Sequence, residues 1–400
     1  MKKPKIRFNG YTEDWEQRKL GELAEIVGGG TPSTSMNSYW DGDIDWYAPA
    51  EIGEQIYLKS SQRKITEEGL NKSSAKMLPI GTVLFTSRAG IGKTAILLKE
   101  GCTNQGFQSI VPNKEKLDSY FIFTRSEELK RYGETVGAGS TFVEVSGKQM
   151  ANMELMMPTK MEEQQKIGNY LHSLDHLIAL HQRKCEETKK LKKYMLQKMF
   201  PQNGKNVPEI RFSGFTDVWE QRKFEELYEK NIEKNIGLIS YDKTISIATM
   251  TYKYEGNGAS DESLKTYKVL RLGDLAFEGH TNKDFRYGRF VANDIGVGIM
   301  SPRFSTIRPI KDMPVSFWKY YIHYEPIMRN VLVNSTKAGT MMNELVITDF
   351  MRQSIRVPSI EEQKKIGDYL DSLDHLITLH QRKCDELQNL KKFMLQNMFV

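Results

Sequence analysis

The residue pattern that most resembles a catalytic motif is Ser87-Arg88-Ala89-Gly90-Ile91-Gly92-Lys93-Thr94, which ends in Gly-Lys-Thr as a phosphate-binding loop does. Such a loop also needs a glycine five residues before Gly92, because its backbone must wrap closely around the phosphates. Ser87 occupies that position. The pattern therefore favours a glycine turn between two strands over a nucleotide site.

A second candidate for chemistry is the pair His172 and His176, whose i, i+4 spacing can hold a metal ion on one helical face. The corresponding positions later in the chain are Asp371 and His375, so the pair is not repeated. We therefore favour the interpretation that both histidines are polar residues on a helix surface. The cysteines form no CxxC pair and cannot all pair with one another, which predicts a reducing cytoplasm with neither a zinc site nor a disulfide framework: Cys102, Cys185 and Cys384.

The composition is that of a globular protein of two or three domains. The chain has 400 residues, of which 39% are hydrophobic and 27% charged. No apolar run approaches the ~18 residues that a membrane helix needs. The basic N-terminus is not followed by an apolar segment, so we expect no secretory signal. A net charge of +6 is compatible with a nucleic-acid partner without requiring one.

An internal repeat organises the chain. The segment from Pro4, which leads into Trp-Glu-Gln-Arg-Lys at 15–19, returns from Pro208 with the same five residues at 219–223. Residues 162–200 align without gaps on 361–399, with 29 of 39 positions identical. The stretches between these copies barely resemble each other, and each contains short β-like runs and glycine-rich loops. This arrangement indicates one task performed on two different targets.

Each long repeated segment predicts an amphipathic helix of coiled-coil character. A helix of 39 residues would span roughly 58 Å at ~1.5 Å per residue, and its apolar stripe needs a partner. Pseudo-two-fold symmetry makes the other copy an antiparallel partner and brings the segment midpoints His181 and His380 close together. The predicted contact residues are Ile167, Leu171, Leu174, Ile178 and His181 in the first copy and Ile366, Leu370, Leu373, Ile377 and His380 in the second.

The prolines mark the boundaries of these segments. Pro158 and Pro358 precede the two helices, and Pro201 ends the first of them. The predicted fold class is α+β, with two α/β heads separated by two long antiparallel helices that form a coiled-coil spacer. The predicted divisions are a first head, a first helix, a second head and a second helix at 1–157, 158–202, 203–357 and 358–400.

The chain resembles the specificity subunits of type I restriction–modification systems. In that family two dissimilar domains alternate with two nearly identical helices, each introduced by Pro-x-x-(x)-Glu-Glu-Gln-x-Lys-Ile. The motif stands here at 158–167 and again at 358–366. The resemblance also extends to the heads, through Gly81–Arg88 with Gly90–Lys93 and through Gly273–Phe277 with Arg286–Arg289.

The resemblance implies a non-catalytic subunit whose heads are target-recognition domains, each reading half of an asymmetric, bipartite site in double-stranded DNA. The helices would fix the gap between half-sites, roughly one DNA turn of ~34 Å, and would dock two methyltransferase subunits. Those subunits would methylate adenine at N6 with S-adenosylmethionine, and motor-nuclease subunits using ATP would join them. This chain has no Pro-Pro pair and so lacks the Asn/Asp-Pro-Pro-Tyr/Phe motif usual in adenine methyltransferases. We expect no cofactor in this chain and no membrane partner.

Polar loop residues are the candidates for DNA contact, because base edges are read by Arg, Lys, Asn, Gln, Ser and Thr side chains that reach a groove. In the first head we select Thr31, Ser33, Arg88, Lys93, Asn104, Gln105 and Thr141. In the second head we select Tyr252, Tyr254, His280, Asn282, Lys283, Arg286, Arg289, Lys337 and Asn343. Trp15 and Trp219 are expected to pack where head and helix meet.

Two other functions remain compatible with the residues. The first is a stand-alone DNA-binding regulator with the same fold, and the second is a coiled-coil scaffold that binds only proteins. Dependence on partner subunits would distinguish the specificity subunit from the regulator. A salt-sensitive, bipartite DNA footprint would distinguish both from the scaffold.

Overall fold

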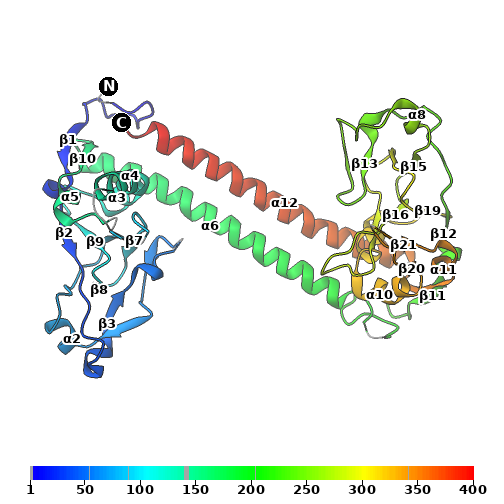
Figure 1. The fold of residues 1–400 in the computed structure, drawn as a ribbon, viewed down its shortest axis with the longest axis horizontal. Coiled ribbons are helices and arrows are strands. Elements are labelled where there is room, and N and C mark those ends of the chain that lie inside the picture. The colour runs from blue at the N-terminus through cyan, green and yellow to red at the C-terminus, as the bar shows by residue number, and fades with distance from the viewer. Residues whose placement is uncertain (1–2, 54, 89, 139–143, 203, 341) are drawn as a thin grey trace. The chain divides into compact units, whose positions relative to one another are not determined.

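The computed structural model describes residues 3–53, 55–88, 90–138, 144–202, 204–340 and 342–400. The chain forms two compact units, the first comprising Met1–His181 with Lys383–Val400 and the second Gln182–Arg382. Two 38-residue helices, α6 (Met161–Lys198) and α12 (Ile360–Asn397), each contribute one part to each unit (Figure 1). Each helix begins one residue before, and ends two residues before, the repeated segment that predicts it.

The first head is a mixed α/β domain. Its principal sheet has the order β2-β9-β6-β7-β4, and smaller sheets pair β1 with β10 and β5-β3-β8. The strands are β1 (Glu16–Lys19), β2 (Ala24–Gly28), β3 (Trp40–Tyr47), β4 (Tyr57–Leu58), β5 (Arg63–Ile65), β6 (Val83–Phe85), β7 (Thr94–Leu97), β8 (Cys102–Thr103), β9 (Gln108–Pro112) and β10 (Glu154–Met157). The helices are α1 (Leu20–Leu23), α2 (Glu67–Asn71), α3 (Ser119–Thr124), α4 (Ser126–Gly137) and α5 (Gly147–Ala151), with 3-10 turns at Asn37–Tyr39 and Pro49–Glu51.

The second head has the same plan with shorter strands. Its main sheet has the order β12-β19-β16-β17, and four two-stranded sheets pair β11 with β22, β13 with β14, β15 with β18 and β20 with β21. The strands are β11 (Glu220–Lys223), β12 (Tyr228–Lys230), β13 (Ile245–Ser246), β14 (Thr251–Tyr252), β15 (Lys268–Leu270), β16 (Leu275–Glu278), β17 (Arg289–Ala292), β18 (Gly298–Met300), β19 (Thr306–Pro309), β20 (Thr336–Lys337), β21 (Glu344–Leu345) and β22 (Ser354–Val357). The helices are α7 (Phe224–Leu227), α8 (Asp261–Leu264), α9 (Val315–Tyr321), α10 (Glu325–Val333) and α11 (Ile347–Arg352), with a 3-10 turn at Tyr241–Lys243.

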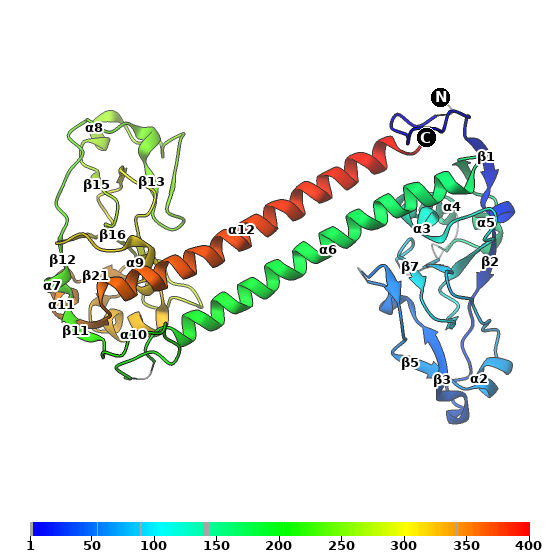
Figure 2. The ribbon, with the colours of Figure 1, turned by 180° about the vertical axis from the view of Figure 1, so that it is seen from behind.

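Antiparallel contact between the helices is present in both units. In the first unit the early part of α6 shares a core with the late part of α12, and the segment around Ile6 lies beside the end of α12 (Figure 2). In the second unit the end of α6 shares a core with the start of α12. The predicted stripe is buried at Ile167, Leu171, Leu174, Ile178, Ile366, Leu370 and Leu373, and Ile377 is half-buried. The expected fold class is confirmed, while the approach of His181 to His380 stays a prediction.

The core of each head is completed by residues at the end of the long helix from the other repeat. Phe399, after α12, packs edge-on against Trp15 at 6.2 Å, whereas Phe200, after α6, packs against Tyr321 at 5.1 Å. The main-chain N–H of Ile6 donates to Asn397 at the end of α12, and that of Ile210 donates to Lys198 at the end of α6, both at 2.9 Å. The core of each head therefore includes residues distant in sequence.

The repeated tryptophans pack at the head–helix junctions, as expected. Trp15 and Trp219 are each 1% exposed. In the first unit Arg7 forms a two-pronged pair with the buried carboxylate of Glu163, at 2.6 and 2.8 Å. In the second unit Arg211 and Glu362 repeat this pair at the same two distances. These pairs hold the first residues of each repeat against the first turn of its own helix.

Candidate nucleic-acid interface

The Gly-Lys-Thr segment of the first head is a hairpin turn, as the sequence indicated. It joins the antiparallel strands β6 and β7, whereas a phosphate-binding loop would lead into a helix. The Thr86 hydroxyl donates to the carbonyl of Gly90 at 2.7 Å and accepts the main-chain N–H of Lys93 at 2.9 Å. Gly92 has φ +96°, and a Cβ there would meet Lys130 of α4 at 2.3 Å, so only glycine fits. The turn holds Arg88 and Lys93 at its two ends.

Two further segments of the first head hydrogen-bond this turn, and a third contacts one of them. The N–H of Ser87 donates to Gly106 at 2.8 Å, and that of Val145 donates to Ser87 at 3.0 Å. The Thr31 hydroxyl hydrogen-bonds the Gln105 side chain. The structure thus brings together four of the selected residues at one edge of the head: Thr31, Arg88, Asn104 and Gln105.

The selected residues of this edge differ in how free their side chains are. Asn104 accepts the N–H of Gly106 at 2.7 Å, so this side chain shapes its own loop. Gln105 and Lys93 are exposed, and Arg88 is half-buried. Ser33 is exposed and hydrogen-bonds Ser35 at 2.8 Å. Thr141 lies outside the described residues.

In the second head the corresponding turn joins β16 to β17. Glu278 ends β16 and pairs in register with Arg289, which begins β17. The buried Glu278 carboxylate contacts the ring nitrogen Nδ1 of His280, and it accepts the N–H of His280 at 3.1 Å. The Arg289 guanidinium donates to the carbonyl of Ala248 at 2.9 Å and lies 5.0 Å from the Phe285 ring. The Glu278 carboxylate thus contacts His280 and lies 3.9 Å from the Nε of Arg289 at the end of this hairpin.

The loop after β20 completes this edge. The N–H of Asn343 donates to Gly279 at 2.9 Å, and its side chain donates to the carbonyl of Arg286 at 3.4 Å. A Cβ on Gly279 would lie 2.0 Å from the Asn343 oxygen, so this close approach requires glycine. The structure brings together five selected residues here: His280, Asn282, Arg286, Arg289 and Asn343.

The selected residues of the second head differ in their exposure and in what their side chains contact. Asn282 accepts the N–H groups of Asp284 and Phe285, at 2.8 and 2.9 Å, and so shapes the loop. Lys283 is exposed on that loop, and Lys337 pairs with Glu344 at 3.3 Å. Tyr252 donates to the carbonyl of Val297 at 2.9 Å. Tyr254, by contrast, is 72% exposed on the neighbouring hairpin, with its ring 6.3 Å from that of Tyr252.

The two edges are equivalent although the heads differ in sequence. Ser87 and Gly279 each accept a main-chain N–H from a later loop, and Arg88 and His280 directly follow them. Gly92-Lys93 and Gly288-Arg289 close the two hairpins. The resemblance of the heads had already matched these two segments, but Glu278 was not among the selected residues. Matching the hairpins by their closing glycine and cation would have placed Glu278 opposite Arg289.

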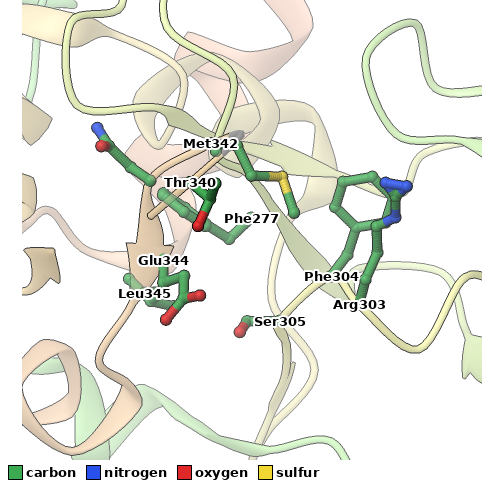
Figure 3. A pocket seen from close by; sticks show the side chains of 10 residues that line it. Phe277, Arg303, Phe304, Ser305, Thr340, Met342, Glu344 and Leu345 are labelled. Carbon is green, nitrogen blue, oxygen red and sulfur yellow. The ribbon is translucent and has the colours of Figure 1, made fainter. Parts of the chain in front are cut away.

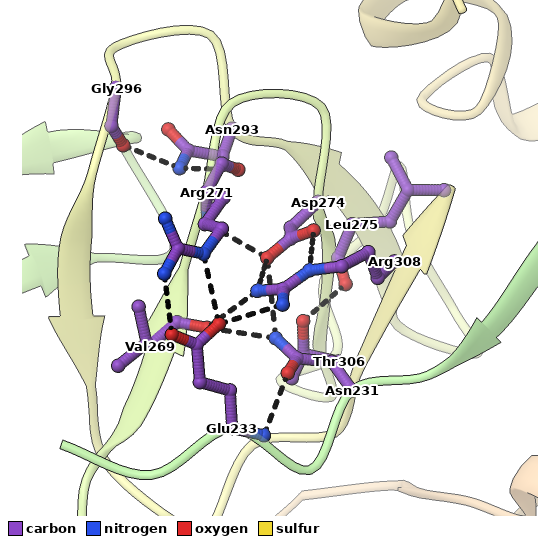
Figure 4. Close-up of polar contacts among 10 residues, drawn as sticks. All are labelled: Asn231, Glu233, Val269, Arg271, Asp274, Leu275, Asn293, Gly296, Thr306 and Arg308. Atoms are coloured by element: carbon purple, nitrogen blue, oxygen red, sulfur yellow. Dashed lines mark hydrogen bonds and ion pairs between the residues drawn. The ribbon is translucent and has the colours of Figure 1, made fainter. Parts of the chain in front are cut away.

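A partly buried polar network joins several strands of the second head (Figure 4). Arg308 binds the buried carboxylate of Asp274 through two nitrogens, at 2.8 and 2.9 Å, and reaches Glu233 at 2.7 Å. Arg271 binds the same Glu233 at 2.7 Å. These hydrogen bonds, first that of Arg271 and then that of Arg308, lower the pKa of Glu233 to about 2. The network joins β19 to the segments around β12 and β15, and it lies at the start of β16, the opposite end of that strand from Glu278.

The described residues contain no group of three or more His, Cys, Asp or Glu side chains that could hold a metal ion. His172, one of the pair spaced for metal binding, packs against the rings of Tyr57 and Tyr120 at 5.9 and 4.7 Å. Burial raises the pKa of the Cys102 thiol to about 11. Within the described ranges, no helix combines the length and apolar character needed to cross a membrane.

Comparison with known proteins agrees with this architecture. The family model described as the type I restriction modification DNA specificity domain matches residues 12–190 and 287–389, well over half of the chain. The MjaIX type I restriction enzyme specificity subunit of Methanocaldococcus jannaschii is 27% identical, with 96% of this chain and 93% of that protein covered. The EcoR124I/EcoR124II specificity subunit of Escherichia coli is 29% identical over 40% of this chain and 41% of that protein.

The fold has a counterpart among solved structures. A type I restriction–modification S subunit from M. genitalium superposes with a TM-score of 0.60 at 12% identity, covering 100% of this chain and 99% of that one. Matching heads, paired helices and a family model that spans both repeats lead to one conclusion. The chain belongs to the family of type I restriction–modification DNA specificity proteins.

Proposed function

We propose that this chain is the subunit that reads DNA sequence for a type I restriction–modification complex, each head reading half of an asymmetric, bipartite site. The observation that carries the proposal is the equivalence of the two hairpin edges. Both present a cationic or protonatable residue at each end of a glycine-closed turn, Arg88 with Lys93 and His280 with Arg289. The surrounding side chains differ between the heads, as two unlike half-sites require.

The chain's own residues do not suit methylation or nucleotide hydrolysis. No Pro-Pro pair exists in the sequence, and the Gly-Lys-Thr segment closes a β-hairpin. We assign adenine methylation with S-adenosylmethionine to methyltransferase subunits, and ATP-driven restriction to motor-nuclease subunits. The whole complex would act on cytoplasmic DNA, and the paired helices would set the gap between half-sites.

The helices offer two equivalent surfaces for methyltransferase subunits. In the first unit Leu177, Leu390 and Phe393 are 40%, 39% and 52% exposed. Their repeat equivalents in the second unit are Leu376, Leu191 and Tyr194, at 40%, 41% and 48%. Large apolar side chains exposed at matching positions indicate protein contacts. Two copies of the surface correspond to two bound subunits.

The test is to express the full chain with the methyltransferase subunit of its own system and to map N6-methyladenine across the host genome by single-molecule sequencing. A single bipartite, asymmetric motif that disappears when this chain is omitted supports the proposal. Sequence-specific DNA binding by this chain in the absence of the methyltransferase subunit would favour a stand-alone regulator. Assembled subunits that produce no motif would favour a protein scaffold.

A further inference from the structure

A cavity of about 440 Å³ opens in the second head beside the loop that carries His280. Three segments form its walls, namely the end of β16, the residues before β19 and the residues leading into β21 (Figure 3). Its apolar walls are Phe277, Phe304, Met342 and Leu345. Its polar side chains are Arg303, Ser305, Thr340, Asn343 and Glu344. Apolar walls with a few convergent polar groups are the usual form of a binding site.

The cavity belongs to the edge that reads DNA in the proposed function. The strand β19 holds the place in the second head that β9 holds in the first, because each pairs with the central strand and with the first strand of its sheet. The segment before β9 carries Gln105, and the segment before β19 carries Arg303. In both heads this segment hydrogen-bonds the hairpin strand: the main-chain N–H of Ser87 donates to Gly106 and that of Phe277 donates to Ser305, both at 2.8 Å. Arg303 thus lies in the segment that corresponds to the one carrying Gln105 on the edge of the first head.

The Arg303 side chain is exposed, and its guanidinium lies near an aromatic ring. Its guanidinium lies 5.8 Å from the ring of Phe304, one of the cavity walls. Among the described residues, no carboxylate forms an ion pair with it. A planar guanidinium held on a ring and open to solvent is the side chain that most often reads guanine, by donating to O6 and N7 in the major groove.

Glu344 lies on the opposite side of the cavity from Arg303 (Figure 3). It pairs with Lys337 at 3.3 Å, where both side chains are more than half exposed, and such a pair is weak. A carboxylate disfavours a phosphate in the same cavity, because like charges repel. It accepts a hydrogen bond from the amino group of cytosine, which lies beside guanine on the major-groove edge of a G·C pair.

We propose that Arg303 and Glu344 together read one G·C base pair of the second half-site, with guanine on the Arg303 side. The inference rests on the proposed function and specifies a residue pair for it. The cavity between the two charges would admit the edges of both bases.

The experiment compares the genomic methylation motif of the full chain, expressed with its methyltransferase partner, with those of Arg303→Ala, Arg303→Lys and Glu344→Gln. All three variants should lose the preference at one and the same position of the second half-site, with the first half-site unchanged. Arg329→Ala is the matched control, because Arg329 is also exposed but pairs with Glu325 on α10. It should keep the wild-type motif. Co-purification with the methyltransferase subunit verifies folding.

The affinity of the purified complex for DNA measures the size of this base preference. On duplexes that differ only at this position, the wild-type complex should prefer G·C by about 5- to 150-fold, and Arg303→Ala should remove most of that preference. A wild-type motif in Arg303→Lys would overturn the inference, because lysine still neutralises a phosphate but lacks the two-pronged geometry. If Arg303→Ala weakened binding equally to the four duplexes that carry each possible base pair at this position, the inference would be overturned too. Absence of any motif with the wild-type chain would instead overturn the proposed function itself.

Discussion

Lys391 of α12 donates to the carboxylate of Asp175 in α6 at 2.5 Å. The same carboxylate accepts the hydroxyl of Tyr120 from the first head at 2.7 Å. The second unit repeats the relationship, because Lys192 donates to Asp374 at 2.6 Å and Tyr320 donates to that carboxylate as well. One aspartate in each unit therefore joins both helices to a head.

Reversing the charges of this pair tests whether it orients the helices. We expect Asp175→Lys and Lys391→Asp each to lower the free energy of unfolding, since each places two like charges together where Asp175 is only 11% exposed. The double reversal should recover about 1 kcal/mol of the summed loss. A double-mutant cycle measured by denaturant unfolding gives this coupling energy. Strictly additive losses would show that the pair contributes nothing.

Removal of Phe200 should destabilise the second head rather than the head of its own repeat. This ring is fully buried among Phe317, Tyr321 and Tyr324. Phe200→Ala should cost about 3–5 kcal/mol, because it leaves a cavity in that core. Hydrogen exchange should show lost protection in α9 and α10, with the strands of the first head unaffected. Phe393→Ala, at a 52% exposed position, is the control and should change stability by about 0.5 kcal/mol or less.

The sequence predicted the helices far better than the reading edges, for a physical reason. Local periodicity determines which face of a helix is apolar, so Leu171 and Leu370 could be placed before the structure was known. The meeting of Thr31 with Gln105 depends on long-range pairing of β2 with β9, which no local pattern encodes. Arg303 was missed because it lies in the short segment between β18 and β19, and no local pattern shows that this segment meets the residues leading into β21. The role of the helix ends in the opposite heads was missed because α6 and α12 were expected to pair mainly with each other.

The network around Glu233 predicts acid sensitivity of the second head. Its pKa is lowered from 4.5 to about 2 in the folded protein, so its ionised form stabilises the fold fully above the unfolded value. That contribution should be lost as the pH falls from about 4.5 through about 2, because the unfolded chain takes up a proton first. Urea unfolding at pH 5 and pH 3 measures the loss. Glu233→Gln should be less stable than wild type at pH 5 and should depend less on pH over this interval. An equal pH dependence in both proteins would assign the acid sensitivity to other groups.

The two apolar surfaces of the helices predict the number of bound methyltransferase subunits. Leu390→Asp with Phe393→Asp places charges on the surface in the first unit, and a desolvated charge opposes docking there. We expect native mass spectrometry to show one bound subunit in this variant instead of two. The equivalent variant, Leu191→Asp with Tyr194→Asp, should also keep one, and combining all four changes should leave none. Two subunits retained in the combined variant would mean that docking uses another face.

The hairpin residues predict that each head can be altered independently. Arg88→Ala should change or relax a position in one half-site only, and His280→Ala should do so in the other, because the two residues lie in different heads. Loss of a base contact should cost ~1–3 kcal/mol at one position of the methylation motif. Loss of a phosphate contact should instead leave the motif intact and reduce the salt dependence of binding by about one unit of slope. Both results keep each residue on the DNA surface of its own head. A change in both half-sites from either single substitution would contradict the two-head arrangement, because it would require one residue to contact both halves of the site.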